Sequence, residues 1–224
     1  MSNNEGFRDS SRLTSWVRYI LYAQIIVAVL SLVSGNFEYQ LLSDYQDGIY
    51  TSQEQAMADG VENDQRQRLI GIVYFVVFFI SMFLILRWIH RANHNARQLG
   101  AENMRFSSGW SIGYYFIPIL TLWKPYQAMK EIWKASKEPS DWESQEVSSI
   151  LPIWWALWLV SNFLGQALFR FSMKAEEIPE LLNLNIIYQV SDVIDIALAL
   201  ALLAIVKRIY SFQSNHVHGA NDQV

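Results

Sequence analysis

The sequence predicts an all-α membrane protein with four transmembrane helices, and three observations lead to this fold class. Of the 224 residues, 52% are hydrophobic, 14% aromatic and only 17% charged, whereas a soluble domain carries about a quarter charged residues. The apolar residues gather in four blocks, each close to the length of a bilayer crossing. The chain also has no cysteine, so it is not a disulfide-stapled secreted domain. Together these observations exclude a disordered chain and a water-soluble globule.

Each of the four long blocks is apolar enough to form one spanning helix. A hydrocarbon core of about 30 Å needs roughly 20 mostly apolar helical residues. The predicted spans cover about residues 16–34, 69–90, 150–171 and 186–206. No convincing cleavage site follows the first block, which favours an uncleaved anchor over a signal peptide. We therefore treat residues 1–224 as a single polytopic membrane domain.

A fifth block, residues 109–123, is too short to cross the bilayer without tilting. As a helix it would be about 22 Å long, and Gly113 and Pro118 interrupt it. We expect a re-entrant or half-inserted segment that enters and leaves on the same side, with its polar backbone satisfied by neighbouring helices or a wet cavity. A tilted fifth transmembrane helix is the alternative.

The distribution of basic residues predicts the orientation. With four crossings and a cytoplasmic N-terminus, 13 of the 17 Lys and Arg residues lie inside, and the outer loops hold ten acidic residues. Basic residues prefer the cytoplasmic side, so we expect both termini there and an acidic outer loop over residues 35–68. All nine Trp fall on the cytoplasmic half, where indole rings anchor at headgroup level. We expect a multi-pass protein of the bacterial inner membrane.

Residues 124–137 have the pattern of an amphipathic helix. Tyr126, Met129 and Trp133 recur at helical spacing, with lysines mostly on the other face, and Pro125 suits the first turn. Such a basic, Trp-bearing helix is typical of a membrane surface rich in anionic lipid, and a helix packed on a cytoplasmic domain is the alternative. The predicted membrane-interface residues are Trp110, Trp123, Pro125, Lys130, Trp133 and Lys134.

The stretch RANHNARQLGAENMRFSSGWSIGYYFIPILTLWKPYQAMKEIW, residues 91–133, resembles a bacterial family of integral membrane proteins catalogued only as a domain of unknown function. The family pattern is a basic R-A-x-x-N-like stretch, a P-G-W turn, F-x-P, L-W-x-P and an E-I-W helix. The matching positions are Arg91, Ala92, Asn95, Gly109, Trp110, Phe116, Pro118, Leu122, Trp123, Pro125, Glu131, Ile132 and Trp133. Ser108 departs from the usual proline. The resemblance implies a multi-pass protein and brings no established activity, ligand or catalytic residue.

The last predicted span carries two acidic residues, Asp192 and Asp195, whose spacing of three places them on one helix face. Charges inside a bilayer are expensive, so they face other helices or water and are common marks of function. Polar residues at similar depth could join them in one layer, which either binds an ion or proton or only holds helices together. The candidate ligand- or ion-binding residues are Asp192, Asp195, Asn162, Gln166 and Gln24.

Three functional hypotheses follow. The first is a non-enzymatic membrane module that binds lipid, through anionic headgroups on the cytoplasmic side, or a partner protein. The second is a small transporter or channel component with an intramembrane carboxylate site. The third and weakest is an intramembrane enzyme, because no nucleophile, phosphate loop or catalytic constellation appears.

We expect no cofactor, no nucleic-acid partner and no metal. His90 and His94 have a ligand spacing but no evident third ligand, and arginines surround them. A homo-oligomer or an unknown protein partner remains open.

Overall fold

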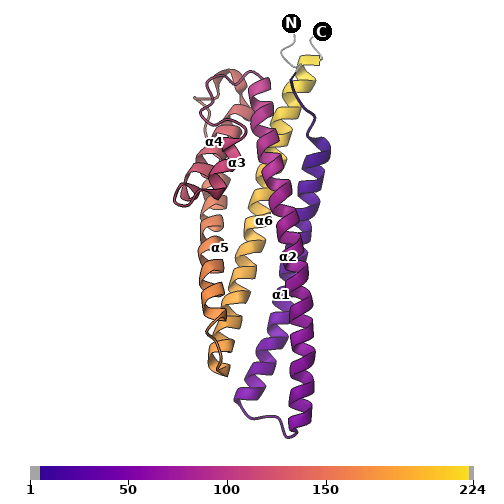
Figure 1. Ribbon diagram of the computed structural model, residues 1–224. Helices are drawn as coiled ribbons and strands as arrows, with labels where there is room; N and C mark the ends of the chain where they lie inside the picture. The colour runs from indigo at the N-terminus through magenta and orange to yellow at the C-terminus, as the bar shows by residue number, and fades with distance from the viewer. Residues whose placement is uncertain (1–5, 222–224) are drawn as a thin grey trace. The chain divides into compact units, whose positions relative to one another are not determined.

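The computed structural model describes residues 6–221 (Figure 1), and within that range the regular structure is entirely helical. In chain order the elements are α1 (Ser11–Gln46), α2 (Gln53–Gln98), α3 (Trp110–Gly113), η1 (Tyr114–Phe116), η2 (Leu120–Leu122), α4 (Lys124–Lys137), η3 (Pro139–Asp141), α5 (Ile150–Ser172) and α6 (Ile178–Asn221). Four of them, α1, α2, α5 and α6, are long and apolar enough to cross a membrane. The predicted fold class, an all-α protein with four spanning helices, is confirmed.

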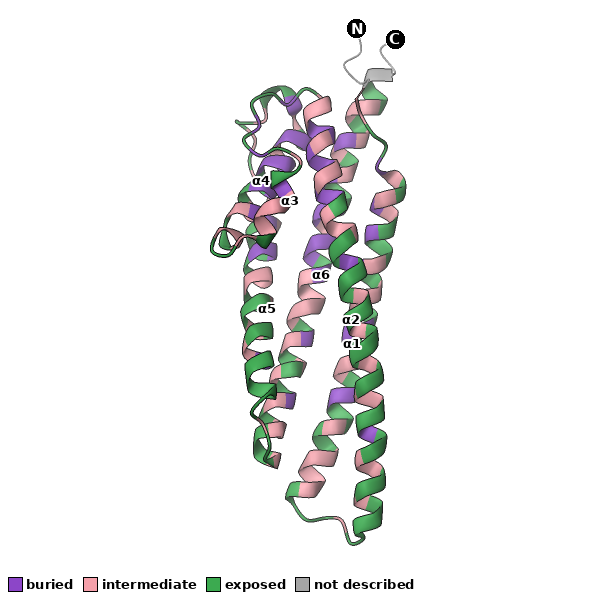
Figure 2. Cartoon of the chain, in the orientation of Figure 1, coloured by how far each residue is buried: buried purple, intermediate pink, exposed green. Residues whose placement is uncertain are grey.

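The middle of α2 shows why these helices need a lipid environment. Only 6% of its most apolar window is buried by protein, and large apolar side chains such as Phe75, Phe79 and Phe83 stay exposed. Figure 2 shows this stretch as largely exposed. A continuous apolar surface of this kind is stable against hydrocarbon but not against water.

The helices continue beyond the predicted spans. Most of the predicted outer loop, residues 35–68, is helical, because α1 runs to Gln46 and α2 begins at Gln53. A tight turn at Gly48, with φ of +66°, reverses the chain between them. Hydropathy marks the part of a helix that lies in hydrocarbon, and it says little about where a helix ends in water.

The short block does not form a fifth spanning helix. Residues 109–123 break into α3, η1 and η2, with extended backbone at Ile117 and a left-handed φ of +69° at Ile119. The chain therefore reverses around Pro118, where the sequence predicts the break. The structure has four long helices of spanning composition in residues 6–221, so the five-helix alternative is wrong.

Two compact units make up the chain, and each is described by itself. Unit 1 comprises residues 1–21, 80–156 and 200–224, and unit 2 comprises residues 22–79 and 157–199. The largest fully buried side chains, among them Trp88, Met129, Ile132 and Ile209, belong to unit 1. The segment between α2 and α5 lies wholly within unit 1, so it leaves and rejoins the same unit.

Helix α4 coincides with the predicted amphipathic helix, and its apolar face is buried by protein. Met129, Ile132 and Trp133 are at most 2% exposed, and the Trp133 ring packs edge-on against Phe212 of α6 at 5.4 Å. Figure 2 shows α4 among the most buried elements. In the structure this face of α4 packs against protein, because α6 continues far enough past its apolar block to cover it.

Candidate functional site

The intramembrane carboxylate of Asp195 lies between two hydroxyl groups in unit 2. The Tyr74 hydroxyl of α2 donates to Asp195 Oδ2 at 2.6 Å, and the Ser161 hydroxyl of α5 donates to Oδ1, also at 2.6 Å. Both carboxylate oxygens are thus occupied. Side chains of α2, α5 and α6 thus meet at this one carboxylate.

Asp192 lies one turn away on α6 and faces a different helix. It is 6% exposed and hydrogen-bonds to the hydroxyl of Ser31 on α1. The two acidic residues therefore share a helix but do not share a set of hydrogen-bond donors. Their common feature is a hydrogen bond from a hydroxyl group on another helix.

Of the polar side chains predicted to join this layer, the structure brings none to the carboxylates. Asn162 is exposed and donates to the Trp158 carbonyl of its own helix at 2.7 Å. Gln166 is exposed and Gln24 is half-buried. In the described part of the chain neither donates to Asp192 or Asp195.

The sequence reasoning missed Tyr74 and Ser161 as the actual partners. Ser161 precedes Asn162 by one residue, which on a helix is a rotation of about 100° and decides which side chain faces α6. Tyr74 carries one of the few hydroxyl groups in a strongly apolar span. This feature of the sequence could have marked it as a hydrogen-bond partner for a carboxylate.

Further polar side chains lie on the same face of α6 as Asp192. Gln189 donates to Asn185 at 2.7 Å, and Asn185 donates to the Gly35 carbonyl at 3.0 Å and to the Glu38 carboxylate at 2.7 Å. The positions 185, 189, 192 and 195 recur every three or four residues, so they form one stripe. This stripe lies within unit 2.

The second candidate site is the segment of residues 109–123 in unit 1, which presents apolar rings outward. Five of its large side chains are 39% to 70% exposed: Trp110, Phe116, Ile119, Leu122 and Trp123. Ile119 is the most exposed of them and has a positive φ. A β-branched residue rarely adopts that conformation, so the local backbone holds this side chain outward at some cost.

Polar contacts fasten the chain immediately before this segment. Asn93 and Arg97 of α2 both donate to the Phe106 carbonyl, at 3.0 Å and 2.7 Å. On the other side, the Glu131 carboxylate of α4 accepts the backbone N–H groups of Arg105 and Phe106, each at 3.0 Å. The base of the segment is therefore held between α2 and α4, and only its apolar tip is left outside.

The six predicted membrane-interface residues divide into two groups. Trp110 and Trp123 are 53% and 39% exposed, and Lys130 is also exposed. Lys134 is half-buried, and its ammonium donates to the Glu143 carbonyl at 3.0 Å. Pro125 and Trp133 are buried inside unit 1.

Lys124, at the junction of the segment and α4, was not among the predicted residues. Its ammonium lies 5.6 Å from the Phe106 ring centre and 6.0 Å from that of Tyr114. Aromatic faces attract a cation at such distances. This holds a positive charge over the buried Phe106 ring and the half-buried Tyr114 ring, at the base of the segment.

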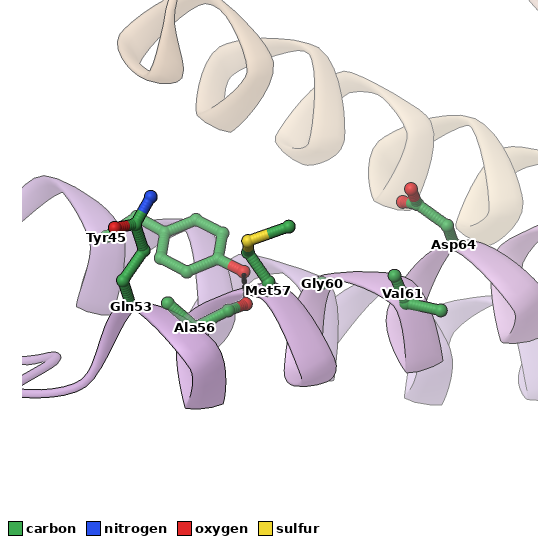
Figure 3. A pocket seen from close by; sticks show the side chains of 7 residues that line it. All are labelled: Tyr45, Gln53, Ala56, Met57, Gly60, Val61 and Asp64. Carbon is green, nitrogen blue, oxygen red and sulfur yellow. Dashed lines mark hydrogen bonds between the residues drawn. The ribbon is translucent and has the colours of Figure 1, made fainter.

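A shallow hollow of about 360 Å³ lies at the turn between α1 and α2 (Figure 3). Seven residues of one helical hairpin line it: Tyr45, Gln53, Ala56, Met57, Gly60, Val61 and Asp64. The Tyr45 hydroxyl donates to the Ala56 carbonyl at 2.6 Å, so the main polar group in the hollow is already satisfied. Within the described residues, no three His, Cys, Asp or Glu side chains are placed to hold a metal ion.

Four helices of the described residues are long and apolar enough to cross a membrane, an architecture compatible with a multi-pass membrane protein. The chain belongs to the family described as Domain of unknown function (DUF4328), whose model matches residues 53–211. The match begins with α2 and ends within α6, so it includes both candidate sites but not α1. No curated protein and no solved structure matches the chain.

Proposed function

We propose that the protein is a non-enzymatic module of the bacterial inner membrane, whose segment 109–123 embeds in the cytoplasmic leaflet and binds lipid there. The observation that carries this proposal is the difference between the exposed apolar tip of the segment and its hydrogen-bonded base. The segment exposes Phe116 and Ile119 by 64% and 70%, while the backbone at its base is fastened by Glu131 and Arg97. Apolar side chains held outward on a fastened base are what a half-inserted segment needs.

The charge distribution supports the cytoplasmic assignment. Thirteen Lys and Arg residues lie in unit 1, and the other four, Arg66, Arg68, Arg170 and Lys174, lie in unit 2. Basic residues are retained on the cytoplasmic side during insertion. Segment 109–123 belongs to unit 1, so it would meet the inner leaflet, with both termini on that side.

Anionic headgroups are the expected lipid partners. Lys124 is half-buried at the end of the segment, and Lys130 is exposed on α4. A basic residue near an anionic surface contributes about 1 kcal/mol. The same lysines would favour phosphatidylglycerol or cardiolipin over a zwitterionic lipid.

Spin-label depth measurements test the insertion. The chain has no cysteine, so single cysteines at Phe116, Ile119 and the exposed control Ser140 need no prior substitution. In nanodiscs, labels at 116 and 119 should be relaxed more by oxygen than by a water-soluble nickel complex, and the label at 140 should show the reverse. Equal nickel accessibility at all three positions would overturn the insertion.

The lipid preference has its own test. Lys124→Gln and Lys130→Gln should each weaken the binding of phosphatidylglycerol relative to phosphatidylcholine, measured by native mass spectrometry of the purified protein. Lys137→Gln, an exposed lysine at the far end of α4, is the matched control. An unchanged preference in both variants would remove the headgroup assignment and leave the insertion standing.

A further inference from the structure

We propose that Arg8, His90 and Arg91 form a binding site for a phosphate group in unit 1, where α2 leaves its apolar block. The phosphate belongs either to a lipid headgroup or to a water-soluble ligand. This site is separate from segment 109–123 and uses none of the lysines assigned to lipid there. Its residues come from one face of α2 and from the short chain segment that precedes α1.

Four basic side chains recur along one face of α2. They are Arg87, His90, Arg91 and His94, spaced by three or four residues. Side chains at such spacing lie on the same side of a helix. The sequence of α2 carries no Asp or Glu from residue 65 to its end at residue 98. No acidic residue of this helix therefore neutralises the basic face.

The chain segment before α1 is fastened against α2 through its backbone. Asn95, which is fully buried, donates to the Arg8 carbonyl at 2.9 Å and accepts the Arg8 N–H group at 3.1 Å. The Arg91 guanidinium donates to the Asp9 carbonyl at 3.1 Å. The backbone at Arg8 is thus fixed beside the basic face, while the Arg8 side chain itself is exposed.

His90 lies at the centre of these basic groups. Arg8, Arg91 and His94 are all close enough to act on the charge of its ring. In the described part of the chain, no hydrogen bond or ion pair engages the imidazole of His90 or the guanidinium of Arg8. A guanidinium has five N–H donors, and Arg91 uses one of them on the Asp9 carbonyl. Several hydrogen-bond donors therefore converge here and are open to a ligand.

One acidic side chain, Asp9, lies beside the cluster but does not neutralise it. Its two carboxylate oxygens accept hydrogen bonds from the backbone N–H and the hydroxyl of Ser11, at 2.8 Å and 2.6 Å. Asp9 is close enough to Arg91 for their charges to interact, which offsets one positive charge. Arginine stays charged at every physiological pH, so Arg8 and Arg87 leave the cluster positive even when both of its histidines are neutral.

These donors suit a phosphate group. Guanidinium groups bond to phosphate oxygens in pairs, and such charge-assisted hydrogen bonds are roughly twice as strong as neutral ones. A metal cation would be repelled by Arg8 and Arg91. The predicted span of α2 ends at residue 90, where a spanning helix meets the lipid headgroups. A lipid phosphate can therefore reach the site, as can a soluble one.

Two probes distinguish these sources: inorganic phosphate, and phosphatidic acid added to phosphatidylcholine nanodiscs. Both are measured on full-length protein that carries Lys124→Gln and Lys130→Gln, so that the lysines assigned to lipid do not contribute. Equilibrium dialysis with labelled phosphate measures the first probe, and native mass spectrometry counts the second. We expect at least one probe to bind. Arg8→Gln and Arg91→Gln should each weaken that binding about tenfold, because each removes a charge-assisted hydrogen bond.

Arg18→Gln is the matched control, because it removes the same charge from an exposed position of α1 and should change the binding little. Binding of inorganic phosphate that Arg8→Gln weakens would support the site and identify a soluble ligand. Binding of phosphatidic acid alone, weakened in the same way, would support it and identify a lipid headgroup. Binding of neither probe would overturn the proposal, and so would an equal loss in Arg18→Gln. Should Arg91→Gln fail to fold, full binding by Arg8→Gln, which alters an exposed side chain, would overturn it as well.

Discussion

Gln213 of α6 donates a hydrogen bond of 2.8 Å to the hydroxyl of Ser136 on α4, across 77 residues of sequence. The same amide donates to the Ala92 carbonyl of α2 at 2.8 Å. Gln213 is 2% exposed and Ser136 is fully buried. One amide group thus ties three helices of unit 1 together, and it does so beyond the apolar block of α6.

Gln213→Ala should therefore destabilise unit 1. The change leaves the Ala92 carbonyl and the Ser136 hydroxyl without this donor, and such losses cost about 1–3 kcal/mol. Thermal unfolding in mild detergent, followed by circular dichroism, measures the effect. Asn215→Ala, at an exposed position on the same helix, is the control and should change little. Equal melting temperatures for the two variants would contradict the role assigned to Gln213.

Glu131→Gln should alter how stability depends on pH. Burial raises the pKa of Glu131 above its ordinary value of 4.5, and the N–H groups of Phe106 and Arg105 and the charges of Arg97 and Arg105 offset this only in part. Between pH 4.5 and the raised pKa, the folded state therefore holds a proton that the unfolded state has released. The contribution of Glu131 to the free energy of unfolding falls as the pH rises through this range. Above the raised pKa it is constant.

The measurement is the free energy of unfolding at several pH values from about 4 to 7. Glu131→Gln cannot titrate, so it should remove this part of the slope. It should also lower stability near neutral pH, because an amide offers only one acceptor to the two N–H groups. Glu146→Gln, at an exposed site, should keep the parent slope. The same slope in Glu131→Gln would show that another group is responsible.

The sequence predicted the spanning helices well because their cause is local. Twenty apolar residues in a row have few alternatives to a helix in lipid, and the break near Pro118 follows from backbone chemistry. The surroundings of α4 could not be predicted from its own sequence. Whether Trp133 meets lipid or protein depends on Phe212, and no pattern around residue 133 reveals that α6 extends so far.

At the carboxylate site, too, one part could be predicted from local sequence and another part could not. The spacing of Asp192 and Asp195 fixes their common face, and the high cost of membrane charge predicts partners. Which residue of α5 supplies the partner depends on the rotation of that helix about its axis. A rotation of one residue separates Ser161, which contacts Asp195, from Asn162, which does not.

Cysteine labelling tests the proposed sidedness. Single cysteines at Asp47, Ser140 and Asn215 occupy exposed positions in the α1–α2 turn, in η3 and near the end of α6. A membrane-impermeant maleimide should label only position 47 in intact cells, and all three after lysis. Labelling at 140 in intact cells would place unit 1 outside and reverse the assignment of its lysines to the inner leaflet.

At the turn between α1 and α2, the effect of one substitution on stability should depend on whether the Tyr45 hydroxyl is present. A methyl group at Gly60 would lie 2.8 Å from the Tyr45 hydroxyl, which donates to the Ala56 carbonyl at 2.6 Å. Gly60→Ala should displace that hydroxyl, and the loss of about 1 kcal/mol for one hydrogen bond should offset the gain in helix propensity, so that the substitution brings no net stabilisation.

In a Tyr45→Phe background the hydroxyl that the new methyl group would meet is absent. Gly60→Ala should there stabilise α2 by up to about 1 kcal/mol, because alanine is the better helix former. Gly71→Ala, at a helical position with no atom within 4 Å of the added methyl, should be neutral or stabilising in both backgrounds. Thermal melts of the four combinations at positions 45 and 60 give the coupling energy directly. Additive effects would mean that the Tyr45 hydroxyl does not occupy the space beside Gly60, and that the turn is held by the ring contact between Tyr45 and Tyr50 instead.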